Sequence, residues 1–189
     1  MFKSHGFVAD SEVVCDNGVT LDLKTLPAFL RTLLVADGTV TKALEAYFWE
    51  PVMVERLAQQ RRVLTAPVEG LPAREGDEVL CREVLLRGQK SGSDYAAARS
   101  FLWLDRLDPA YHRALQEGRI GIGELLREQG IETYREIIGL QYLESPPVDD
   151  ELLALLQPPL MARSYRIRAA GEPAFLVTEY FPVSQYCSA

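Results

Sequence analysis

RSYRIRAAGEPAFLVTEYFPV, residues 163–183, contains two runs rich in Tyr, Ile, Phe, Val and Thr. The runs flank residues 170–173 (AGEP), and a turn-forming cluster between alternating runs predicts an antiparallel hairpin. Alternate side chains of a strand share a face, so the second run projects Glu179 together with Phe175, Val177 and Phe181. An ionised carboxylate is costly to bury unless it is paired. We therefore expect Glu179 to have a cation beside it, a raised pKa or a bound ligand.

Two other strand-like stretches carry the opposite charge on an apolar face. In residues 78–87 (EVLCREVLLR), Arg82 shares a face with three aliphatic side chains. In residues 95–104 (YAAARSFLWL), Arg99 shares a face with an alanine and two aromatic side chains. Arginine suits bidentate recognition of carboxylates, so Arg82, Arg99 and Glu179 together predict a dry pocket for an anionic ligand. The alternative is that all three are solvated or structurally paired on an open sheet face.

Two segments could present backbone N–H groups to such a ligand. Residues 37–41 (DGTVT) open a predicted helix, and the first turn of a helix attracts anions. The alternative is an ordinary capped helix corner. Residues 118–123 (GRIGIG) lack the lysine and hydroxyl residue of a phosphate-binding loop. Their glycines predict either a close backbone approach to a ligand or a tight turn.

The rest of the chain predicts strands joined by turns and helices grouped separately. Besides the strands above, the pattern predicts strands over residues 52–63 and 131–143, the latter with a bulge at Gly139, and a short strand before an Asn17-Gly18 turn. Helices are predicted over residues 24–36, 40–49, 124–129 and 149–156, with a further helix start at Asp108. This grouping is typical of an α+β fold with a mainly antiparallel sheet.

Composition predicts one globular domain, residues 1–189, large enough for a substantial core. The net charge of −7 argues against nucleic acid as the main partner. Three cysteines and two histidines have no metal-type spacing, so no metal site is expected. The N-terminus lacks the apolar segment of a signal peptide, and no apolar run is long enough for a membrane span. A cytoplasmic protein is expected.

The order and spacing of five segments resemble the chorismate pyruvate-lyase family, the 4-hydroxybenzoate synthases. The segments are LLVADGTVTKALEAYFWEPV (33–52), EVLCREVLLR (78–87), AAARSFLWL (96–104), GRIGIGELL (118–126) and residues 163–183. The resemblance implies a six-stranded antiparallel sheet with helices packed on one side and helix-loop flaps over an enclosed pocket. It also implies a cofactor-free elimination of pyruvate from chorismate, which gives 4-hydroxybenzoate.

The resemblance carries five residues over to this chain. Arg82 corresponds to the arginine that binds the ring carboxylate, and Arg99 is expected at the enolpyruvyl carboxylate. Glu179 corresponds to the carboxyl group at the hydroxyl end of the ligand; protonated it could donate to the departing ether oxygen, and ionised it could accept the ring proton. Glu179 and Arg82 are thus the expected catalytic residues. Val40 and Ile122 are expected to donate backbone N–H groups.

Two alternatives remain open at this point. One is a non-catalytic module that binds a small aromatic acid, as in the effector-binding domains of transcription regulators of the same fold. The other is a related lyase that makes another aromatic acid. On the lyase interpretation the partners are chorismate and 4-hydroxybenzoate, no cofactor or metal is needed, and the protein is a monomer or small homo-oligomer.

Overall fold

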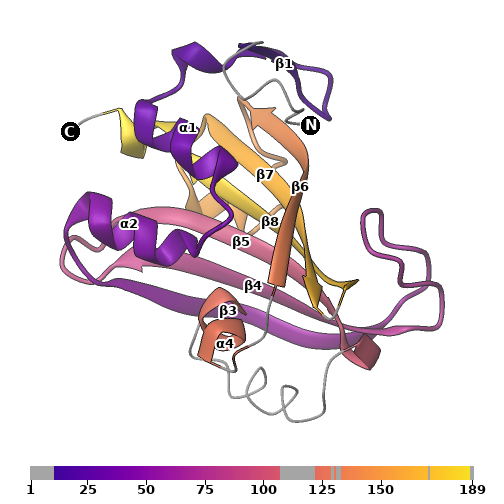
Figure 1. Ribbon diagram of the computed structural model, residues 1–189. Helices are drawn as coiled ribbons and strands as arrows, with labels where there is room; N and C mark the ends of the chain where they lie inside the picture. The colour runs from indigo at the N-terminus through magenta and orange to yellow at the C-terminus, as the bar shows by residue number, and fades with distance from the viewer. Residues whose placement is uncertain (1–10, 107–121, 129, 131–132, 170, 188–189) are drawn as a thin grey trace.

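The computed structural model describes residues 11–106, 122–128, 130, 133–169 and 171–187, and its centre is one antiparallel sheet (Figure 1). The six strands lie in the order β3-β4-β5-β8-β7-β6, and every neighbouring pair is antiparallel. Their bounds are β3 Val52–Val63, β4 Glu78–Gly88, β5 Asp94–Trp103, β6 Thr133–Leu143, β7 Leu160–Ala169 and β8 Glu172–Pro182. The α+β fold with a six-stranded antiparallel sheet is therefore confirmed.

The predicted hairpin over residues 163–183 is the pair β7 and β8. Arg163 lies opposite Glu179 in the register, and Gly171 turns the chain with φ +85°, a conformation that glycine adopts without strain. The bulge predicted at Gly139 is also present, because the register between β6 and β7 shifts between Ile137 and Gly139. Local turn chemistry and alternation were enough to locate both features.

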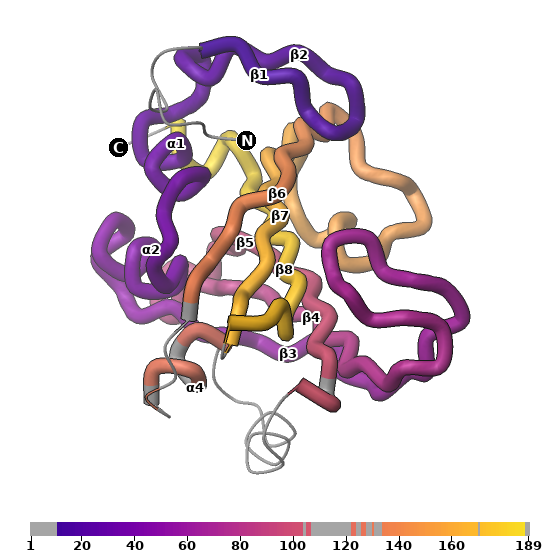
Figure 2. Tube along the Cα trace, turned by 45° about the vertical axis from the view of Figure 1, so that its right-hand side comes forward, coloured from indigo at the N-terminus to yellow at the C-terminus, as the bar shows by residue number. Residues whose placement is uncertain are grey.

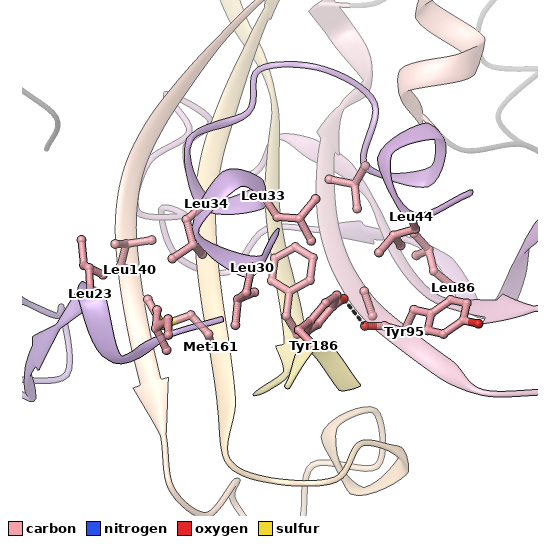
Figure 3. Close-up of a cluster of buried hydrophobic side chains, with 14 of the residues drawn as sticks. Leu23, Leu30, Leu33, Leu34, Leu44, Leu86, Tyr95, Leu140, Met161 and Tyr186 are labelled. Atoms are coloured by element: carbon pink, nitrogen blue, oxygen red, sulfur yellow. Dashed lines mark hydrogen bonds between the residues drawn. The ribbon is translucent and has the colours of Figure 1, made fainter. Parts of the chain in front are cut away.

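Within the described residues, three α-helices pack on one face of the sheet: α1 (Ala28–Val35), α2 (Val40–Phe48) and α4 (Ile122–Glu128). Figure 3 shows Leu30, Leu33 and Leu34 of α1 against Leu140 and Met161 of the sheet. Tyr186 closes this cluster and donates a hydrogen bond of 2.6 Å from its hydroxyl to the carbonyl oxygen of Tyr95. The helices are thus held to the sheet by apolar burial, as their amphipathic pattern predicts.

The opposite face is covered by two connecting segments, residues 64–77 and 144–159, which Figure 2 shows on the other side of the sheet from α1 and α2. The predicted short helix over residues 149–156 is present only as the 3₁₀ turn Leu153–Leu155. Its last two N–H groups bond three residues back, and the proline pair at 158–159 prevents continuation.

The N-terminal described residues form a small ribbon, β1 (Glu12–Val14) paired with β2 (Thr20–Asp22), around the predicted Asn17-Gly18 turn. The expected helix start at Asp108 and the first glycines of the 118–123 segment lie outside the described residues. No helix in the described part of the chain is long and apolar enough to cross a membrane.

Candidate active site

A cavity of about 70 Å³ lies between the helix-bearing face of the sheet, the corner that joins α1 to α2, and the start of α4. The corner contributes residues 38–41, and α4 contributes Ile122 and Gly123. The sheet contributes five apolar or small side chains and three titratable ones. These eight are Leu86, Ala98, Ser100, Ile167, Val177, Arg135, Tyr165 and Glu179, and Val40 of α2 completes the apolar wall. The cavity therefore combines an apolar lining with a few convergent polar groups, as small-molecule sites do.

Glu179 of β8 lines this cavity with only 8% of its surface exposed. Its Oε2 accepts a 2.8 Å hydrogen bond from Nε of Arg163, and its Oε1 accepts a 3.0 Å bond from the hydroxyl of Tyr165. Burial raises the pKa of the Tyr165 hydroxyl, the charge of Glu179 adds to that rise, and nearby arginines oppose it. Tyr165 therefore acts as a neutral donor that, with Arg163, orients the carboxyl group toward the cavity.

Arg163, which holds Glu179, is a site residue that strand alternation did not reveal. It is 1% exposed, stands directly across from Glu179 on β7, and its guanidinium lies 5.2 Å from the centre of the Tyr165 ring. Its Nη1 donates to the carbonyl oxygen of Ala36 at 2.7 Å and to that of Leu33. Arg163 therefore joins the end of α1 to the carboxyl group in the cavity. The available signal was its position two residues before Tyr165, on the same strand face.

Arg82 of β4 is buried on the same sheet face, with 2% of its surface exposed. It lies opposite Ser100, which lines the cavity and donates from its hydroxyl to the carbonyl oxygen of Arg82 at 3.4 Å. Burial, together with the smaller effect of the charge of Arg56, lowers the pKa of Arg82 to about 10. The guanidinium is still charged at neutral pH and is well suited to an anionic ligand.

The register places Arg82 and Glu179 two strands apart and two residues apart along the strand direction. With about 4.8 Å between strands and about 3.4 Å per residue, their Cα atoms are separated by roughly 12 Å. A small ring with polar groups at opposite ends can bridge a pair at this separation on one sheet face.

Arg99 is not brought to this cavity, which corrects the expectation that it shares a face with Arg82 and Glu179. It lies opposite Glu83 in the register, whereas Arg82 lies opposite Ser100, so the two arginines project to opposite faces of the sheet. Nε of Arg99 is 2.7 Å from Glu83, and its Nη2 is 3.1 Å from Asp150. Arg99 therefore ties the 144–159 segment to the sheet.

Val40 and Ile122 are the first residues of α2 and α4, and both line the cavity. Arg135 of β6 also lines it and was not singled out before. Among the described residues, no group of three or more His, Cys, Asp or Glu side chains could share a metal ion. The polar side chains that line the cavity are those of Thr39, Thr41, Ser100, Arg135, Tyr165 and Glu179.

Comparison with known sequences identifies related lyases. Residues 34–187 match the family model described as "Chorismate pyruvate-lyase Rv2949c-like". A chorismate pyruvate-lyase of Mycobacterium leprae is 32% identical over 161 residues, which is 85% of this chain and 77% of the relative. One of Mycobacterium tuberculosis is 29% identical over 168 residues, which is 85% of this chain and 82% of the relative.

Comparison with solved structures identifies the same fold in proteins of low sequence identity. PhnF from Mycobacterium smegmatis superposes with a TM-score of 0.59 at 17% identity, over 79% of this chain and 66% of PhnF, just under two thirds of its length. The effector domain of PhnF alone superposes with a TM-score of 0.58 at 17% identity, over 80% of this chain and 92% of that domain. At this identity the likeness concerns the fold alone.

Proposed function

Because the chain belongs to the Rv2949c-like chorismate pyruvate-lyase family, we propose that it removes pyruvate from chorismate and releases 4-hydroxybenzoate. The observation that carries the proposal is the buried Glu179, held by Arg163 and Tyr165, at a cavity on the same sheet face as Arg82. A buried carboxyl group and a buried guanidinium on one largely apolar sheet face match a ring acid with an oxygen substituent at the far end.

The reaction needs no oxidant and no added group. The bond between the ring carbon and the enolpyruvyl ether oxygen breaks, and the neighbouring ring carbon loses its proton. The electrons of that C–H bond complete the aromatic ring, and the enolpyruvate takes up a proton to become pyruvate. Aromatisation supplies much of the driving force, so the protein chiefly has to hold a reactive conformer and exclude water.

In this proposal Glu179 accepts the ring proton. Two donors, Arg163 and Tyr165, bond its two oxygens in the structure and hold the carboxyl group in place at the cavity, which general-base catalysis requires. Arg82 binds the ring carboxylate at the buried end of the site. The backbone N–H groups of Val40 and Ile122 complete the polar contacts from the two helix starts that cover the cavity.

The small cavity has a kinetic consequence. Its volume of about 70 Å³ is far below that of a typical ligand site, which is about 300 Å³ or more. Substrate entry therefore requires the α1–α2 corner or the start of α4 to move away from the sheet. Release of the aromatic product requires the same movement, and we expect this step to limit turnover.

Incubation of the purified protein with chorismate, without added metal or cofactor, tests the proposal. We expect pyruvate and 4-hydroxybenzoate to accumulate in equal amounts, well above the spontaneous background of a sample without protein. Chromatography of both products is the measurement. No pyruvate above that background would overturn the proposed activity, and pyruvate with a different aromatic acid would instead identify a related lyase.

A second candidate function is favoured by the likeness to the PhnF effector domain. A protein of this fold could bind a small aromatic acid without converting it. Calorimetry with 4-hydroxybenzoate and with chorismate separates the two functions: saturable binding of either acid without any pyruvate release would identify a binding module.

Replacing Arg99 by glutamine tests whether this arginine contacts the substrate. We expect KM and kcat for chorismate to stay within about twofold of the wild type, because Arg99 contacts Glu83 and Asp150 on the other face. Each of these part-exposed ion pairs contributes about 0.2–1 kcal/mol, so the melting temperature should fall by only a few degrees. A rise in KM of tenfold or more, measured by initial rates, would show that Arg99 contacts the substrate.

A further inference from the structure

Chorismate has two carboxylates, and in the proposed function Arg82 binds only the carboxylate on the ring. The second, on the enolpyruvyl group, needs another cation, because Arg99 faces away from the cavity. We propose that Arg135 binds the enolpyruvyl carboxylate and thereby distinguishes the dicarboxylate substrate from the monocarboxylate product. This inference rests on the proposed lyase function and deepens it.

The position of Arg135 supports this assignment. It lies opposite Ile167 in the register, and directly opposed residues share a face, so both project to the cavity side of the sheet. Its Nη1 donates a 2.5 Å hydrogen bond to the carbonyl oxygen of Asp37, in the α1–α2 corner. The guanidinium therefore reaches across the cavity mouth from β6 to the segment that covers it.

Gly123 provides the space for this guanidinium. A Cβ atom at Gly123 would lie 3.0 Å from Nη2 of Arg135 and 3.3 Å from Oγ1 of Thr39, both tighter than ordinary side-chain contacts. The glycine thus lets the start of α4, the α1–α2 corner and Arg135 meet at one point. An anion bound there touches both segments that have to move for substrate entry.

Charge also favours a ligand at Arg135. Within the described ranges, no carboxylate lies within ion-pairing distance of its guanidinium, whereas Arg166 and Arg168 on the adjacent strand both pair with Glu136. Arg135 is half-buried, so a carboxylate bound to it is partly shielded from water and gains more than it would on an open surface. Arg82 and Arg135 together match the two charges of chorismate.

The experiment compares two ligands in two variants. Arg135→Gln should raise KM for chorismate by about tenfold or more, which corresponds to about 1.4 kcal/mol. The same variant should change Kd for 4-hydroxybenzoate by less than threefold, because that product lacks the second carboxylate. Arg168→Gln is the matched control, since it removes an arginine of the neighbouring strand that does not line the cavity, and both values should stay near those of the wild type.

Two outcomes would overturn the assignment: a KM for chorismate within twofold of the wild type, or equal weakening of both ligands, which would indicate general damage to the site. If the wild type releases no pyruvate, the lyase function fails separately. Calorimetric Kd values for chorismate and 4-hydroxybenzoate then replace KM. Weaker binding of chorismate but not of 4-hydroxybenzoate by Arg135→Gln would support the assignment of Arg135 to the second carboxylate. A wild type that binds neither ligand also counts against the assignment.

Discussion

Glu179→Gln is expected to lower kcat for chorismate turnover by about 10²–10⁴-fold, the usual contribution of a positioned general base. Glutamine has nearly the same shape, and its carbonyl oxygen can still accept the hydrogen bond from Arg163. It cannot take up the ring proton. KM should change much less than kcat, because the loss concerns the transition state and not the binding of chorismate.

The control for this variant is Glu83→Gln. Glu83 is also a strand carboxylate paired with an arginine, but it lies on the opposite face with Arg99. Initial rates of pyruvate release, together with melting curves, separate lost chemistry from lost folding. A Glu179→Gln protein that melts like the wild type and retains more than a third of its kcat would remove Glu179 from the reaction.

Arg163→Met is expected to destabilise the fold by about 3–5 kcal/mol, because removal of one partner leaves a buried charge without compensation. Glu179 would keep only the hydroxyl of Tyr165 as a donor, and the carbonyl groups of Leu33 and Ala36 would lose the guanidinium that anchors α1 to the sheet. For a chain of this size each kcal/mol lowers the melting temperature by about 2–4 °C. A drop of roughly 6–20 °C should follow.

Two further variants identify the cause of that loss. Arg168→Met removes an exposed arginine from the same strand and should cost at most about 1 kcal/mol. The double variant Arg163→Met with Glu179→Leu removes both charges, and it should recover part of the lost stability while remaining inactive. Recovery should be incomplete because α1 still lacks its anchor. Denaturant unfolding that shows less than 1 kcal/mol of loss for Arg163→Met would refute the structural role.

Much of the fold follows from local patterns in the chain. The bounds of β3 over residues 52–63 agree with the prediction, and β7 and β8 form the predicted hairpin around residues 170–173. Alternation within one strand also sufficed to place Glu179 with Val177 and Phe181. These features depend on neighbouring residues, whose propensities and side-chain period are visible in the sequence itself.

Which residues lie at the site depends on how strands that are distant in the sequence pair with one another. Alternation assigns Arg82 and Arg99 each to one face of its own strand, but only the register between β4 and β5 decides whether those faces coincide. A shift of one residue moves a whole set of side chains to the other side of the sheet. The register pairs Arg82 with Ser100, so Arg82 shares the face of Glu179 while Arg99 does not.

The positions of Arg163 and Arg135 at the site also could not be predicted from alternation within a single strand. Residues 163–168 contain three arginines, and strand alternation cannot indicate which of them meets a buried carboxylate on the next strand. Only the pairing of β7 with β8 brings Arg163 to Glu179, and only the packing of the α1–α2 corner against β6 brings Arg135 to the cavity. Strand, turn and helix positions are local and can be derived from the chain, whereas the partners of its buried charges are set by long-range register and packing.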